Sequence, residues 1–273
     1  MKRQPGWMAT LAAVFLCLCA MMPIAPAQTL ESATYLGTYY QTKGSNTLVL
    51  RLMEFPNALN PTGKSGVVFG SVNTLFGQSD PDSPLWEFFG PYDVATRQIQ
   101  VITSQPVDAV YTGEGILNPA TNSFSITFFN ATSTEGLTEM FDNVKLDTGD
   151  TPYMVGIWRW KAAATNSGLL GINPPYGGQF HITSQDPDGR IRGAFAKVNP
   201  GDVGTLDGRM SGNQINFTRS GKDANGVDFV QAWGGTLTED KLGILGVIEQ
   251  NNPVPWSGDF EANWPQPGWV PRR

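Results

Sequence analysis

Aromatic residues are the side chains of this sequence best suited to hold a ligand. The chain has 8 Trp, and several of them recur at alternate positions along β-like segments. Trp158 and Trp160, for example, share one face of a predicted strand while Arg159 takes the other. Flat apolar rings suit lipophilic ligands and sugar rings, although alternating Trp residues on strands are also common core residues. We predict six ligand-binding residues: Trp158, Trp160, Phe180, Trp233, Trp256 and Phe260.

Residues suited to catalysis are few. The single His, His181, lies between Phe180 and Ile182, and a period of two places it on the opposite, exposed face of the strand. It has no evident acid–base partner in the sequence. No Gly-x-Ser-x-Gly elbow is present, and one His with two Cys is a poor basis for a metal site. We therefore predict no catalytic residues and no metal or other cofactor, and we favour a protein that is not an enzyme.

Carboxylates leave one enzymatic alternative open. Four acidic residues are candidates for an acid–base pair: Glu54, Glu87, Glu139 and Asp142. Glycosidases need two such groups facing one cleft, and the sequence does not fix their separation. Asp-Pro-Asp recurs in the two halves, but it supplies only part of the six or more oxygens that calcium needs, so we interpret it as a turn.

The first 27 residues are typical of a cleavable signal peptide. Lys2 and Arg3 precede a mostly apolar stretch over 8–22, and Ala25-Pro26-Ala27 has the small-x-small form that signal peptidase accepts. The apolar stretch is short for a spanning helix, so we favour cleavage after Ala27 over a membrane anchor or a lipoprotein. The protein is therefore expected to be secreted or periplasmic, with no membrane span.

Cleavage would change the composition of the chain. Both Cys residues, Cys17 and Cys19, leave with the signal peptide, so disulfides and thiol catalysis are excluded for the mature protein. The net charge of −6 becomes −8, because Lys2 and Arg3 leave and no acidic residue does. An acidic protein without a basic run is a poor nucleic-acid binder, so we expect a small-molecule partner and no nucleic acid. The oligomeric state stays open.

Short motifs recur in the same order in the two halves of the chain, which indicates duplication of one β unit. The paired motifs are Tyr35–Tyr40 with Met154–Arg159, Gly66–Gly70 with Gly189–Gly193, and Tyr111–Gly113 with Trp233–Gly235. The polar, turn-rich region from Leu146 to Pro152 separates the halves. We predict one unit over 28–149, a second over 150–264, and a proline-bearing tail over 265–273.

Strand and tight-turn signals dominate both units. Asp186-Pro187-Asp188-Gly189 predicts a hairpin turn, and Ser211-Gly212-Asn213 predicts another. Apolar residues alternate with polar ones from Trp256 to Trp264, which is typical of a half-buried antiparallel strand. The best helical candidate, Thr134–Phe141, is one or two turns at most. The predicted fold is all-β, with two tandem antiparallel meander units that form barrels or sandwiches.

The second unit resembles the small meander barrels of the calycin group, the avidins and lipocalins. The resemblance rests on four segments: Gly156-Ile157-Trp158, Asp188–Gly193, Trp233–Leu237 and Trp256–Trp264. It implies an eight-stranded up-and-down barrel whose mouth holds a small apolar ligand. Arg159-Trp160-Lys161-Ala162 departs from the biotin-binding pattern of avidins. The Arg that lipocalins pack on their first-strand Trp is not found near the closing strand.

Three functions follow from these observations. The favoured one is an exported, non-enzymatic binding protein for a small, largely apolar or aromatic-stacking ligand, held in the second unit. This inference rests on fold analogy. The first alternative is a hydrolase or isomerase that acts on a lipid or glycan through carboxylates at a barrel mouth. The second alternative is a structural or surface-interaction protein whose aromatic residues only fill the core.

Overall fold

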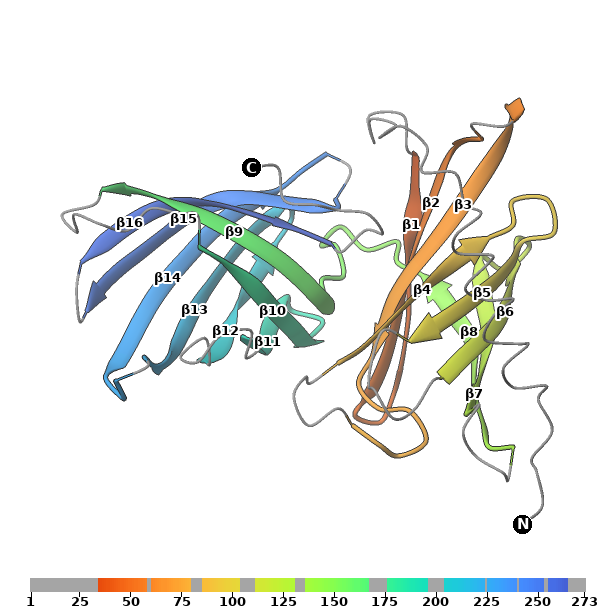
Figure 1. Ribbon diagram of the computed structural model, residues 1–273, viewed down its shortest axis with the longest axis horizontal. Coiled ribbons are helices and arrows are strands. Elements are labelled where there is room, and N and C mark those ends of the chain that lie inside the picture. The colour runs from red at the N-terminus through yellow and green to blue at the C-terminus, as the bar shows by residue number, and fades with distance from the viewer. Residues whose placement is uncertain are drawn as a thin grey trace, which may run out of the picture.

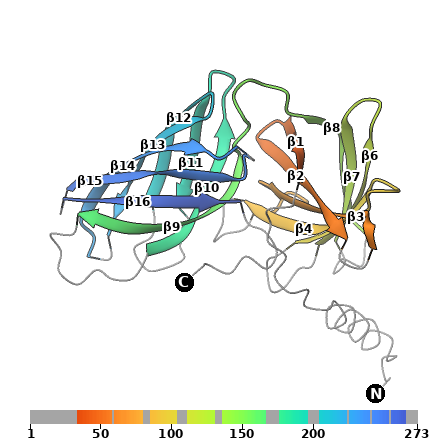
Figure 2. The same cartoon turned by 90° about the horizontal axis from the view of Figure 1, so that it is seen from above.

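The protein consists of two closed β-barrels, each of eight antiparallel strands, arranged side by side (Figures 1 and 2). The computed structural model describes residues 34–264 except 58–59, 80–84, 104–110, 131–135, 167–175, 196–203, 224, 240 and 253–254. The predicted signal peptide, the C-terminal tail and the first Asp-Pro-Asp turn lie outside the described residues. The prediction of an all-β fold with two tandem meander barrels is confirmed.

Barrel 1 is built from the first eight strands. They are β1 (Thr34–Lys43), β2 (Asn46–Asn57), β3 (Asn60–Val72), β4 (Trp86–Tyr92), β5 (Gln98–Thr103), β6 (Tyr111–Asn118), β7 (Ser123–Asn130) and β8 (Thr138–Leu146). Each strand pairs with the next in sequence, and β1 closes the barrel on β8 through Tyr39 and Tyr40. The last strand includes Thr138–Phe141, the described part of the segment that was the best helical candidate, so this part is extended. Phe141 and Val144 both face the core although they are three residues apart, because the pairing of β8 with β7 shifts register here and Asn143 has a φ of 61°.

Barrel 2 repeats the same meander. Its strands are β9 (Gly156–Asn166), β10 (Tyr176–Gln185), β11 (Arg190–Phe195), β12 (Gly204–Ser211), β13 (Gln214–Lys222), β14 (Asp228–Leu237), β15 (Gly243–Asn252) and β16 (Trp256–Asn263). Strand β9 pairs with both β10 and β16 and so closes the barrel. The predicted turns at 186–189 and 211–213 join β10 to β11 and β12 to β13, with positive φ at Gly189 and Gly212.

The internal repeat is confirmed by the positions of its motifs. The first motif pair lies on β1 and β9, the second on or just before β3 and β11, and the third on β6 and β14. Each pair is therefore eight strands apart. Gly37 and Gly156 hold the same place in their barrels, with φ of 143° and 142°. A side chain at Gly156 would collide with the Trp264 ring, which explains why glycine is needed at this position.

The two hydrophobic cores are organised differently. The core of barrel 1 fills its interior with the inward residues of β2, such as Leu48, Leu50 and Leu52. The core of barrel 2 continues outside its own interior, because it includes Val49 and Met53 from the opposite face of β2. Strand β2 is consequently buried on both faces over this stretch. The barrels are thus joined by a packed apolar contact as well as by the chain.

Arg51 lies at the centre of this contact. It is 2% exposed, and its guanidinium stacks on Trp264 at 3.4 Å from the ring centroid, with Trp158 at 5.7 Å. Its Nη2 donates to the carbonyl of Tyr153 (3.0 Å) and its Nη1 to that of Val155 (3.4 Å). Burial lowers the Arg51 pKa to about 10, so the side chain stays charged at neutral pH. Barrel 1 therefore supplies a cationic side chain to the first-strand Trp of barrel 2.

His181 lies on the outer face of barrel 2, opposite Phe180 and Ile182 as predicted, but it is only 1% exposed. The expectation of an exposed histidine is therefore wrong. Its register partner Ile157 is also buried, and the neighbouring Arg159 forms an ion pair with Glu87 of barrel 1 (3.3 Å). Burial lowers the His181 pKa to about 4, so its imidazole is neutral at pH 7.

Among the residues that the structure describes, no helix is long and apolar enough to cross a bilayer.

Candidate functional site

The two barrels differ in how their ends are filled. In barrel 1 the segment 73–78 after β3 crosses one end, where Leu75 is fully buried and Phe76 packs on Tyr111. Gln78 accepts hydrogen bonds from the Trp86 indole (3.2 Å) and the Tyr111 hydroxyl (2.7 Å). This end of barrel 1 is therefore covered by its own chain. The candidate site lies in barrel 2, which contains the predicted ligand-binding residues.

Barrel 2 has a base beside barrel 1 and a mouth that points away from it (Figures 1 and 2). The base holds the first residue of β9, Gly156, together with Trp264. The mouth is the end at which β9, β11, β13 and β15 finish. Because β9 runs from base to mouth, Trp158 lies near the base and Trp160 lies one inward position closer to the mouth.

The structure brings together five of the six predicted ligand-binding residues inside barrel 2. Trp158, Trp160, Phe180, Trp233 and Phe260 are each 7% exposed or less and belong to one cluster. The Trp233 ring lies 4.8 Å from Phe260 and 5.1 Å from Trp160, while Phe180 lies 6.4 Å from Trp158. Trp256 is half-buried and packs against the same cluster. These rings form a continuous aromatic interior of contacting side chains.

The two neighbouring tryptophans of β9 have different hydrogen bonding. Near the base, the Trp158 indole donates to the Met154 carbonyl at 3.0 Å, so its polar edge is satisfied. Nearer the mouth, the Trp160 Nε1 is buried and has no acceptor among the described residues. This Nε1 lies against the inner wall at Gly178, where an added Cβ would be 3.2 Å away. A buried donor without an acceptor is costly, so a group that accepts a hydrogen bond from Trp160 Nε1 would be favourable here.

A polar chain crosses the inner wall next to the aromatic rings. Arg219, Gln231 and Gln250 are register neighbours on β13, β14 and β15. Gln231 Oε1 accepts from Arg219 Nη1 (3.4 Å) and from Trp233 Nε1 (3.2 Å), and its Nε2 donates to Gln250 Oε1 (2.9 Å). The Arg219 guanidinium lies 4.2 Å from the Phe195 ring centroid and 4.9 Å from that of Phe229. A positive charge is thus held inside an aromatic barrel.

The sequence reasoning did not identify Arg219, although a signal for it was present. In β13, Ile215 and Phe217 are buried and the residues between them are exposed. Arg219 continues the buried set at the next alternate position and is 5% exposed. An arginine on the apolar face of an amphipathic strand is unusual, because charged side chains are seldom buried without a specific environment.

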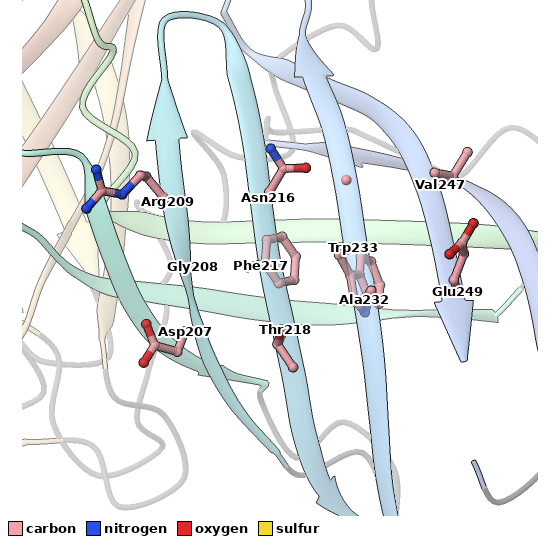
Figure 3. Close-up of a pocket in the computed structure, with 11 residues that line it drawn as sticks. Asp207, Gly208, Arg209, Asn216, Phe217, Thr218, Ala232, Trp233, Val247 and Glu249 are labelled. Atoms are coloured by element: carbon pink, nitrogen blue, oxygen red, sulfur yellow. The ribbon is translucent and has the colours of Figure 1, made fainter. Parts of the chain in front are cut away.

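A groove lies on the outer face of barrel 2 (Figure 3). It has a volume of about 460 Å³ and runs across β12, β13, β14 and β15. Two rows of outward residues line it, Asp207 with Thr218, Ala232 and Glu249, and Arg209 with Asn216, Gly234 and Val247. Ala232 and Gly234 leave space in the middle of the rows, and Asp207, Arg209, Val247 and Glu249 stand at their ends. The rings of Phe217 and Trp233 lie on the inner side of the same strands.

The carboxylates considered for catalysis occupy four separate environments. Glu54 pairs with Lys64 at 3.0 Å, and Glu87 pairs with Arg159 of barrel 2. Glu139 accepts a hydrogen bond from the Phe76 backbone amide, and Asp142 accepts one from the Ser125 hydroxyl. All four residues belong to barrel 1, and these contacts do not bring two of them into one acid–base pair.

Comparison with protein families and curated proteins does not identify a family for this chain. No protein-family model and no curated protein matches the chain. The two closed eight-stranded antiparallel barrels are consistent with a calycin-like fold.

Proposed function

We propose that this protein is an exported, non-enzymatic binding protein whose second barrel holds a small, largely apolar ligand near its mouth. The observation that carries the proposal is the buried Trp160 Nε1, a hydrogen-bond donor in an aromatic interior that lacks an acceptor among the described residues. A ligand would supply that acceptor. The surrounding rings of Trp233, Phe195 and Phe260 would contact its apolar body.

The predicted ligand-binding residues would have different roles in this proposal. Trp160 and Trp233 would face the ligand, and Trp256 would lie at the rim. Trp158 and Phe180 lie deeper, where Trp158 is fixed by Met154 and by the Arg51 stacking on its neighbour Trp264. They would form a rigid floor for the site. A rigid aromatic floor lowers the entropy lost on binding, because its side chains are already ordered.

The proposal is tested by filling the site from its wall. Gly178→Leu would place a side chain against Trp160 inside the barrel. Gly234→Leu is the matched control, since it adds the same group in the outer groove, where only the flexible end of Asn216 lies near. Binding of the neutral apolar fluorophore N-phenyl-1-naphthylamine is measured by titration, after circular dichroism has shown that both variants fold.

We expect Gly178→Leu to weaken fluorophore binding by about tenfold or more, which corresponds to about 1.4 kcal/mol. Gly234→Leu should leave the dissociation constant within about twofold of wild type, a change of less than 0.5 kcal/mol. Equal affinity in wild type and Gly178→Leu would contradict a site inside barrel 2.

A second candidate function is the binding of a partner on the outer face of barrel 2. The groove of about 460 Å³ favours it, together with three exposed apolar residues on the same strands, Val230, Leu245 and Val247. In that case Gly234→Leu would be the disruptive variant and Gly178→Leu the silent one. The carboxylate-dependent hydrolase receives less support, since its four candidate residues lie in separate environments of barrel 1.

A further inference from the structure

The groove on the outer face of barrel 2 has the form of a surface for an extended chain. It crosses four neighbouring strands, from β12 to β15, which is about 14 Å at about 4.8 Å between strands. Exposed Val230 and Leu245 continue its apolar surface along β14 and β15. A small molecule is usually enclosed by its pocket, whereas a peptide lies along an open surface. The groove therefore suits a short segment of a partner protein.

The charges at the β12 end of the groove are already compensated. Asp207 accepts two hydrogen bonds from the Arg190 guanidinium, at 3.2 and 2.8 Å. Arg209 in turn donates to Asp188 at 2.8 Å. Each positive charge at this end has a carboxylate beside it, so this end offers a partner little net charge.

The β15 end of the groove carries negative charge instead. Val247 is 50% exposed and faces Asp259 of β16 in register, while Glu249 is the next outward residue of β15. Glu249 and Asp259 are both exposed, and neither forms an ion pair with a residue that the structure describes. Such diagonal neighbours are about 7–8 Å apart, so two carboxylates flank one apolar side chain.

The middle of the groove is small and polar. Ala232 and Gly234 of β14 leave the space, and a Cβ added at Gly234 would meet the Asn216 Oδ1 at 3.0 Å. Figure 3 shows Asn216 and Thr218 between the β12 end and the β15 end. An amide and a hydroxyl can both donate and accept, so they can hydrogen-bond a peptide backbone.

The charge of the whole chain favours the same kind of partner. The sequence has a net charge of −6, which attracts a basic partner and opposes the approach of an acidic one. A second copy of this chain would bring the same negative charge to the groove.

We propose that the outer groove of barrel 2 binds a basic, extended segment of a partner protein. A Lys or Arg side chain of the partner pairs with Glu249 and Asp259, and an apolar side chain beside it packs on Val247. This inference rests on the second candidate function, in which the groove is a partner-binding surface. It is independent of the ligand inside barrel 2.

Two peptides that differ only in charge test this proposal. Their sequences are Lys-Ala-Val-Ala-Lys and Gln-Ala-Val-Ala-Gln, which place the basic and apolar side chains at alternate positions of an extended chain. Both have blocked termini and carry the same neutral fluorophore. Their binding to the full-length protein is measured by fluorescence anisotropy.

The variants separate local charge from net charge. Glu249→Gln and Asp259→Asn, singly and together, remove the proposed partners of the basic side chain, and Gly234→Leu fills the groove. Glu114→Gln is the matched control, because it removes one exposed carboxylate from β6 of barrel 1. Gly178→Leu is a second control, because it acts inside barrel 2.

We expect wild type to bind the basic peptide about tenfold more tightly than the neutral one, since two exposed ion pairs of about threefold each would form. Each single carboxylate variant should lose about threefold of this preference, and the double variant most of it. Gly234→Leu should weaken both peptides. Glu114→Gln and Gly178→Leu should behave as wild type.

The outcomes distinguish the charge from the groove. Equal affinity of wild type for both peptides overturns the basic partner, and so does a preference that survives in the double variant or is lost in Glu114→Gln. If neither peptide binds, the groove as a partner surface is overturned, while the site inside barrel 2 is still judged by its own fluorophore assay. Self-association in sedimentation that Gly234→Leu abolishes would assign the groove to a second copy and overturn the proposal.

Discussion

Arg51 provides the sharpest test of how the two barrels depend on each other. Its guanidinium donates to two backbone carbonyls, those of Tyr153 and Val155, and stacks on the Trp264 ring in a contact that is 2% exposed. Arg51→Ala would remove two charge-assisted hydrogen bonds of about 1.5–3 kcal/mol each and a cation–π contact of about 2 kcal/mol. Arg51→Ala also removes the desolvation penalty of a buried charge, which offsets this loss of stability by several kcal/mol.

The net expectation for Arg51→Ala is a loss of about 3 kcal/mol in the free energy of unfolding, because the two carbonyls stay buried and a cavity is left. Arg51→Met, which fills the space without hydrogen bonding, should lose less, about 1–2 kcal/mol. With a urea m-value of about 3 kcal/mol/M, Arg51→Ala would lower the midpoint by about 1 M.

Urea unfolding followed by tryptophan emission is the appropriate assay, since Trp158 and Trp264 report directly on this contact. The control is Arg192→Ala, which removes an arginine whose side chain is 43% exposed and should change stability by less than about 1 kcal/mol. If the midpoints of Arg51→Ala and Arg192→Ala coincide, Arg51 does not couple the barrels and the reasoning is wrong.

Three further predictions concern pH, backbone geometry and processing. His181 is neutral when folded, with a pKa of about 4, and takes up a proton when unfolded below about its ordinary pKa of 6.5. Stability should therefore fall by up to about 3 kcal/mol as pH drops from about 6.5 to about 4, and His181→Gln should flatten this dependence in urea titrations at each pH. Gly156→Ala should lower the thermal midpoint more than Gly37→Ala, because an added Cβ meets the rigid Trp264 ring in the first case and a leucine methyl in the second. Intact mass measurement of the exported protein should give a chain that begins at Gln28; a full-length mass would refute the cleavage.

The regular part of the fold was predictable from local sequence. The segment from Trp256 to Trp264 was predictable as a strand, because its apolar and polar residues alternate as the two faces of a strand require. Strand β16 covers Trp256–Asn263 of this segment. The turn at 186–189 was predictable since a glycine with positive φ is required there. The paired motifs Tyr35–Tyr40 and Met154–Arg159 also indicated the duplication, and their glycines, Gly37 and Gly156, lie on the equivalent strands β1 and β9.

The contacts between the barrels were not predictable from such patterns. His181 was expected to be exposed, because a period of two reports only which face of a strand a residue is on, and not what covers that face. The cation on the first-strand Trp was sought near the closing strand of barrel 2, yet Arg51 comes from β2 of barrel 1, more than 100 residues earlier. Within barrel 2, Arg219 could have been identified as buried from its place on the apolar face of β13, but the rings of β11 and β14 beside it could not have been predicted.

The most direct test of the central claim is native mass spectrometry of the protein purified gently from the cells that produce it or from their medium. A binding protein with an aromatic site in barrel 2 should retain a small molecule. The extra mass should disappear in Gly178→Leu and persist in Gly234→Leu. A protein mass without any adduct, together with no change of tryptophan emission on adding small apolar molecules, would contradict the account.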